Sequence, residues 1–169
     1  SPLADTSLPD AGFVYLPGGY PELYLAALSA NRQMLQSIRR YVESGGKLLA
    51  ECGGMMYLCD EIRDKNGYVY PMAGVLHQSA TMENMKLRLG YRTLLYNETR
   101  LKGHEFHYSR LVEQQNPLPS CAVAYTAKGV ETDTPLYHYK NVWAGYTHLY
   151  WADPVGNEWF TKFVIDGNI

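Results

Sequence analysis

The sequence has no apolar run long enough to span a bilayer, and its opening residues, SPLADTSLPD, have neither the basic nor the apolar region of a signal peptide. It also has no excess of charge of one sign. The 15 Lys and Arg residues against 17 Asp and Glu give a net charge of -2, so the chain has no general electrostatic attraction to nucleic acid or to an anionic membrane. These absences predict a soluble, cytosolic protein that binds neither nucleic acid nor a membrane.

Two kinds of site are also missing from the sequence. There is no G-x-x-x-x-G-K-[ST] phosphate loop, and SGGKLL is too short to be one, so no ATP or magnesium site is expected in these 169 residues. Cysteine is scarce: Cys52, Cys59 and Cys121 are an odd number without zinc-type pairing. Reduced thiols are therefore expected, with neither a disulfide framework nor a metal site.

The first half of the chain alternates strand and helix patterns. Residues 12–16, GFVYL, predict a strand that ends at the paired glycines of PGGYPE, where Pro21 suits the first turn of a helix. The apolar spacing of residues 31–46 predicts a second helix that stops at Gly45. KLLAEC, residues 47–52, is the next predicted strand and GGMMYLCDEI, residues 53–62, the next helix. This order predicts parallel strands with right-handed crossovers.

The second half has a different texture. Aromatic and β-branched residues separated by polar turns predict mainly β structure in MAGVLH (72–77), LRLGYRTLLY (87–96), HEFHYSRLV (104–112) and CAVAYTA (121–127). A final helix is predicted over residues 154–165. Residues 1–169 are thus expected to form a single α/β domain: a three-layer, mostly parallel, doubly wound sheet with a β-rich second half.

Cys52 stands at the joint between a predicted strand and a predicted helix. A nucleophile on such a turn is held clear of the sheet, and the amide of the next residue is free to face an oxyanion. The helix N-terminus also favours the thiolate, which is the reactive form. A small buried cysteine at a tight turn explains the pattern equally well, so both interpretations stay open. Cys59, seven residues on, is expected in the core.

A thiolate that transfers acyl groups needs a base, and the order of residues along the chain cannot choose among the five histidines. His148 lies in the apolar segment WAGYTHLYW, where an imidazole is costly to bury without a partner. The alternation in GHEFHYS places Glu105 and His107 on one face of a strand. Two ligands without a third are a weak metal signal, so a hydrogen-bonded strand face is favoured there.

Five motifs occur in one order: LPGGYPE, AECGGMMYL, MKLRLGYR, GHEFHYS and AGYTHLYW. Together, over nearly the whole chain, they resemble the C-terminal glutaminase domains of the cobyrinic acid a,c-diamide synthases, a branch of the class I, or triad, glutamine amidotransferases. The resemblance implies a cysteine that attacks the side-chain amide of glutamine, releases ammonia and leaves a glutamyl thioester for water to hydrolyse. The ammonia would serve ATP-dependent amidation of the a and c carboxylates of cobyrinic or hydrogenobyrinic acid in cobalamin biosynthesis.

The resemblance also implies roles for individual residues. Cys52 is the expected nucleophile and His148 the base, while the amides of Gly19 and Gly53 form the oxyanion hole and Tyr20 belongs to the same substrate-binding set. Triad enzymes commonly follow the histidine with Pro and Glu, whereas Leu149 and Tyr150 stand here. A Cys-His dyad is the simplest interpretation, with Glu105 as the candidate third member.

Partners are implied as well. The family carries an N-terminal synthetase domain, which would hold ATP and magnesium and receive the ammonia. Its glutaminase domains open with a further strand and helix before the SPL segment, so the first β-α unit is expected to be missing from this chain. A sheet edge left unpaired in that way would favour a homo-oligomer or lower stability.

Two other classes of function stay open. One is a cysteine peptidase or deglycase related by fold, whose motif order matches poorly. The other is a non-catalytic docking fragment of the synthetase with a dormant cysteine. Release of glutamate from glutamine would separate the glutaminase from both.

Overall fold

The computed structural model describes residues 1–166, and its centre is a four-stranded sheet in the order β1 (Phe13–Leu16), β2 (Lys47–Glu51), β12 (Val142–Gly145) and β11 (Leu136–Tyr139). β1, β2 and β12 run parallel, and β11 is antiparallel to β12. The predicted parallel pairing of residues 12–16 with residues 47–52 is therefore confirmed. Side chains alternate between the two faces of each strand, so each face has its own apolar core.

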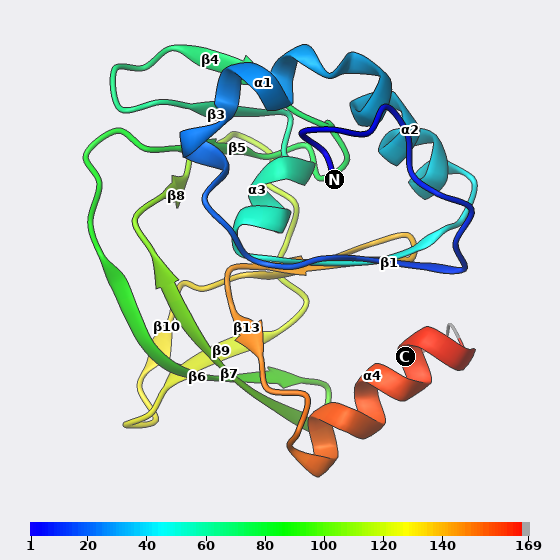
Figure 1. Cartoon of the computed structure of the whole chain (residues 1–169). Coiled ribbons are helices and arrows are strands. Elements are labelled where there is room, and N and C mark those ends of the chain that lie inside the picture. The colour runs from blue at the N-terminus through cyan, green and yellow to red at the C-terminus, as the bar shows by residue number, and fades with distance from the viewer. Residues whose placement is uncertain (167–169) are drawn as a thin grey trace.

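Helices cover one face of this sheet (Figure 1). They are the short 3-10 helix η1 (Pro21–Leu23), α1 (Leu25–Ala30), α2 (Arg32–Glu43) and α3 (Gly53–Leu58). α2 begins where the Asn31 side chain accepts a hydrogen bond from the Met34 amide at 3.2 Å, and the chain leaves it through Gly45 at φ 90. Its buried side chains pack on this face of the sheet, against Val14, Leu48 and Val142.

The opposite face carries α4 (Pro154–Asp166) and a five-stranded antiparallel sheet (Figure 1). The strand order of that sheet is β10 (Glu131–Thr132), β9 (Val123–Thr126), β6 (Arg88–Tyr96), β7 (Thr99–His107) and β13 (His148–Leu149). Leu49 and Trp143 of the central sheet pack there with Trp159 and Phe163 of α4. The three-layer, doubly wound α/β class and the β-rich second half are thus confirmed, and so is the final helix.

A third, mixed sheet has the order β4 (Val69–Pro71), β3 (Glu61–Arg63), β5 (Ser79–Thr81) and β8 (Arg110–Leu111). Two predictions were wrong in this region. The helix expected over residues 53–62 ends at Leu58, and the chain enters β3 at Glu61. MAGVLH forms no strand: its apolar side chains are buried, but Gly74 at φ 65 turns the backbone between them.

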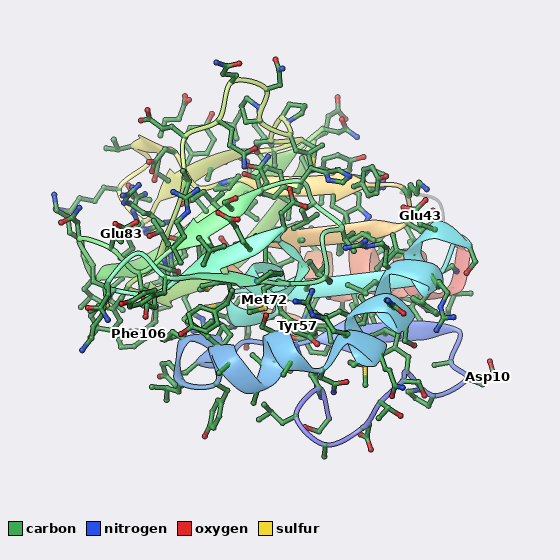
Figure 2. The ribbon with its side chains drawn as sticks, turned by 90° about the horizontal axis from the view of Figure 1, so that it is seen from above. Asp10, Glu43, Tyr57, Met72, Glu83 and Phe106 are labelled. Atoms are coloured by element: carbon green, nitrogen blue, oxygen red, sulfur yellow. The ribbon has the colours of Figure 1, made fainter. Side chains whose placement is uncertain are left out.

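Figure 2 looks down on the helix-covered side of the molecule. Tyr57 and Met72, which are buried, lie toward the middle of the view, whereas Asp10 and Glu83 lie near its rim. Within residues 1–166, no helix combines the length and the apolar character that crossing a membrane requires. β1 pairs with β2 on one side, and the expectation of a further opening strand and helix stays a prediction.

Candidate active site

Cys52 lies on the sharp turn between β2 and α3. Its backbone adopts φ 49 and ψ -110, a conformation that non-glycine residues rarely hold. Two backbone hydrogen bonds fix the turn: the Cys52 amide donates to the Gly145 carbonyl at 2.8 Å, and the Met56 amide donates to the Cys52 carbonyl at 3.0 Å. This strained strand-to-helix turn is the form expected for a nucleophile elbow.

The two glycine turns of the sequence meet beside Cys52. A Cβ on Gly53 would lie 2.5 Å from the Gly19 carbonyl oxygen, and one on Gly54 would lie 2.2 Å from the Leu16 carbonyl oxygen. Only glycine permits this close packing of the PGG turn on the CGG turn. The structure therefore brings Gly19 and Gly53 together next to the thiol, and Tyr20 lines the same pocket as Cys52.

His148 lies beside Cys52 and hydrogen-bonds to its thiol. It opens the short strand β13, which pairs with β7 so that His148 lies opposite His104, and the two imidazoles stack with centroids 5.0 Å apart. A Cβ on Gly18 would lie 2.1 Å from Cε1 of His148, so the absence of a side chain at Gly18 makes room for the ring. Hydrogen bonding to the Cys52 thiol and then to Glu51 raises the pKa of His148 to about 9, against the opposing effect of burial.

Glu51, the last residue of β2, is the carboxylate that faces this imidazole. Its Oε2 lies 3.7 Å from Nδ1 of His148. The same carboxylate accepts a hydrogen bond from the Tyr15 hydroxyl at 2.6 Å and another from the Leu149 amide at 3.0 Å. Cys52, His148 and Glu51 thus form one contiguous group at the carboxyl ends of the parallel strands.

Glu105, the candidate third member, has different neighbours. It is fully buried on β7, 3.0 Å from Nη2 of Arg92 and 3.7 Å from Nε2 of His107, and it accepts a hydrogen bond from Thr147 at 3.3 Å. Burial alone would raise its pKa, but hydrogen bonds from His107 and Thr134 and the Arg92 charge leave that pKa below its usual range. The predicted common face of Glu105 and His107 is confirmed, and the carboxylate points at Arg92 and His107 rather than at His148.

A narrow pocket opens at Cys52. Its lining includes the backbone turn at Gly19 and the side chains of Glu22, Phe106 and Tyr108. The Cys52 sulfur lies 3.9 Å from the Phe106 carbonyl oxygen, and burial raises the pKa of Glu22. A larger cavity of about 330 Å³, lined by Arg88 and Arg110 among others, shares His107 with this pocket.

The other thiols lie in different surroundings. Cys59 is fully buried, as predicted, and burial raises the pKa of its thiol; burial also raises the pKa of Cys121 to about 11. Both changes make the thiolate scarcer and the thiol less reactive. In the part of the chain that the structure describes, no three His, Cys, Asp or Glu side chains gather as a metal ion would require.

Comparison with known proteins identifies the family. The model of the CobB/CobQ-like glutamine amidotransferase domain matches residues 1–155. The chain belongs to this family. The CobB/CobQ-like domain is 39% identical over 155 residues to a hydrogenobyrinate a,c-diamide synthase of Pseudomonas aeruginosa, covering 89% of this chain and 34% of that protein. It is 38% identical over 158 residues to a cobyrinate a,c-diamide synthase of Fusobacterium nucleatum, covering 89% of this chain and 34% of that protein.

These relatives confirm the resemblance found in the sequence, and the chain spans about a third of their length. Among solved structures, a glutamine amidotransferase superposes with a TM-score of 0.58 at 20% identity, over 90% of this chain and 79% of the other. The PurLQS structure from Thermotoga maritima superposes with a TM-score of 0.56 at 17% identity, over 86% of this chain and 72% of the other. At these identities the solved structures support only the fold. The family assignment rests on the family model and the sequence relatives.

Sequence reasoning missed three residues of the site: Glu51, Tyr15 and Gly18. The letters AEC place Glu51 directly beside Cys52, but neighbours on a strand point to opposite faces, so adjacency alone did not suggest a shared role. Tyr15 meets Glu51 across the pairing of β1 with β2, and Gly18 meets His148 across more than a hundred residues of chain. These contacts depend on tertiary structure that no local motif records.

Proposed function

We propose that this chain hydrolyses glutamine through a thioester on Cys52 and supplies the ammonia to a synthetase. The observation that carries the proposal is the meeting of the strained Cys52 turn with the imidazole of His148. In this scheme the thiol proton already resides on His148, whose pKa of about 9 keeps the ring protonated near neutral pH, and the Cys52 thiolate attacks the side-chain amide carbon of glutamine. The imidazolium then protonates the departing ammonia, which leaves a glutamyl thioester for water to hydrolyse.

The oxyanion of the tetrahedral intermediate needs donors on the side of the carbonyl away from the imidazole. We propose the backbone amides of Gly19 and Gly53 for this role, because their turns pack against each other beside the thiol. Tyr20 would close the pocket over the substrate, since it lines the cavity at Cys52 and is otherwise exposed.

The relatives' names support a proposal for the acceptor of the ammonia. We propose that the chain acts as the glutaminase domain of a longer synthetase that amidates the a and c carboxylates of cobyrinic or hydrogenobyrinic acid. The relatives carry those names and are about three times as long as the matched region. ATP and magnesium would belong to the synthetase part, which would also be the domain's partner.

Substitution of Cys52 tests the proposal. Cys52→Ala should abolish glutamate release from glutamine, because no other group in the pocket can form the thioester. Cys121→Ala is the matched control and should retain wild-type release, since this thiol lies in another part of the molecule. Glutamate release by Cys52→Ala at the wild-type rate would refute the proposal. That result would favour the alternative that the chain is a docking fragment and that a contaminating glutaminase releases the glutamate. Chromatography that separates the activity from the chain would reveal such a contaminant.

A further inference from the structure

Glu51 is a carboxylate in an unusual environment. Its side chain is 4% exposed, yet its two hydrogen-bond donors, the Tyr15 hydroxyl and the Leu149 amide, are both neutral. A buried carboxylate retains its charge only where donors and a positive partner compensate for the lost water. The group in position to carry that positive charge is the imidazole of His148, whose Nδ1 lies 3.7 Å from Oε2 of Glu51.

The strand register explains how Glu51 reaches the histidine. Tyr15 lies opposite Leu49 where β1 pairs with β2, and Leu49 packs on the side of the sheet covered by α4. Glu51, two residues after Leu49, points to that same side, and His148 approaches from the antiparallel sheet there. The residue next in the chain, Cys52, turns toward the imidazole through its strained backbone.

We propose that Glu51 is the positioning carboxylate of His148 and that Tyr15 holds Glu51 in place. The inference rests on the proposed function of Cys52 and His148. Glu51 orients the ring so that Nδ1 faces the carboxylate and the other nitrogen is left for the thiol. When the S–H bond of Cys52 breaks and its proton passes to the ring, Glu51 stabilises the imidazolium that forms.

The contacts of Tyr15 support its part. The hydroxyl donates to Oε2, the oxygen that also faces His148, so the hydroxyl and the imidazole share one oxygen. Burial, together with the hydrogen bond to Glu51, raises the pKa of Tyr15, so the phenol keeps its proton and stays a donor near neutral pH. The Leu149 amide holds the other oxygen at 3.0 Å and completes the restraint.

The first test is Glu51→Gln in this chain, which keeps the shape and removes the charge. Thioester formation should fall about 10²-fold or more, mainly in kcat, because the imidazole loses its orientation. Histidine NMR should show the pKa of His148 falling from about 9 toward its ordinary value. The other groups that face this ring are the Cys52 thiol and the exposed His104, and neither is changed in the variant.

Glu105→Gln is the matched comparison, since it neutralises the other buried carboxylate that stands beside a histidine. Glu105→Gln should leave the pKa of His148 unchanged. Glu51→Asp should restore the titration partly, because it returns the charge at a greater distance. If Glu105→Gln lowered the pKa of His148 and Glu51→Gln did not, the inference would be wrong.

The second test uses Tyr15→Phe, which should slow thioester formation about tenfold through loss of a hydrogen bond to a charged group. Tyr41→Phe removes a comparable bond, from a hydroxyl to the Lys47 carbonyl at 2.9 Å, far from the thiol, and should keep the wild-type rate. This pair carries the test if Glu51→Gln does not fold. Equal rates for the two tyrosine variants would overturn the role of Tyr15.

The rate of Cys52 alkylation by iodoacetamide separates this inference from the proposed function. If Cys52→Ala still released glutamate, the proposed function would fall and the inference with it. If Cys52→Ala were inactive and Glu51→Gln kept both the wild-type rate and the wild-type pH dependence of alkylation, the function would stand and the inference alone would fail.

Discussion

Within residues 1–166, two buried carboxylates lie beside histidines, one in the central sheet and one in the five-stranded antiparallel sheet. Glu51 of the parallel sheet faces His148, and Glu105 of the antiparallel sheet faces His107. Glu105 also has the guanidinium of Arg92 at 3.0 Å, whereas the hydrogen-bond donors to Glu51 are a phenol and an amide. The charge of Glu105 is therefore balanced within its own sheet, and that of Glu51 is directed at an imidazole.

Glu105 belongs to a structural ion pair, whereas Glu51 belongs to the proposed catalytic group. Both carboxylates are buried and both have a histidine within 3.7 Å, so neither burial nor proximity tells them apart. The neighbours of the two histidines distinguish the two carboxylates. His107 stacks on Tyr146 and hydrogen-bonds to the Ser109 carbonyl, whereas His148 faces a thiol on a strained turn. Substitutions in the Glu51 region should therefore change the rate of thioester formation, and substitutions in the Glu105 region should change stability.

Removal of the imidazole in the Glu51 region should have the largest effect. His148→Ala should slow thioester formation by about 10³-fold or more, because general acid and base help to both the thiol and the leaving ammonia is lost. His138→Ala, which removes an exposed imidazole stacked on Trp143, is the control and should keep the wild-type rate. A near-normal rate in His148→Ala would mean that another base serves Cys52.

Breaking the ion pair in the Glu105 region should cost stability instead. Arg92→Ala leaves the Glu105 carboxylate buried without its cation, which typically costs about 3–5 kcal/mol of unfolding free energy. Lys102→Ala on β7, the strand of Glu105, breaks an exposed pair with Asp153 and should cost less than about 1 kcal/mol. Urea denaturation followed by tryptophan fluorescence measures both; equal losses would contradict the structural role assigned to Arg92 and Glu105.

Displacing the histidine without removing it should have a smaller effect. In Gly18→Ala the new methyl group would meet Cε1 of His148 at 2.1 Å, so the ring must shift, and we expect about a 10²-fold loss of thioester formation. A Cβ at Gly12 meets nothing within 4 Å, so Gly12→Ala is the matched control. Wild-type kinetics in Gly18→Ala would show that the ring position matters less than the contact suggests.

Much of the fold could be predicted from the sequence, because its signals are local. The period of α2, the strands β1 and β2 and the glycines around Cys52 each depend on a few neighbouring residues. The end of α3 could not be predicted from the sequence. The apolar pattern of MMYLCDEI fits a continuing helix as well as it fits a helix followed by a strand. The strand predicted at MAGVLH was wrong because a buried apolar loop that bonds to α2 and α3 has the same composition as a strand.

The candidate site also combines residues that local motifs predict with a residue that only strand pairing reveals. Cys52, Gly19 and Gly53 stand in turns that the sequence marks, and the structure brings them together with His148 and Tyr20, although their catalytic roles stay predictions. The sequence offers Glu105 as the candidate third member, because the Glu that commonly follows the catalytic histidine is replaced here by Tyr150. Glu51 instead supplies the carboxylate that faces His148, through the register of β1, β2 and β13, and pairing between distant strands leaves no local pattern in the sequence.

The most direct test of the account is labelling of the chain with a diazo-ketone analogue of glutamine, followed by peptide mapping. Cys52 should be the labelled residue, glutamine should protect it, and His148→Ala should slow the labelling, because the thiolate forms only with its imidazole partner. Cys59 and Cys121 should stay unlabelled, as burial raises both of their pKa values. Labelling of either of these thiols in preference to Cys52, or labelling of Cys52 that glutamine does not prevent, would contradict the account.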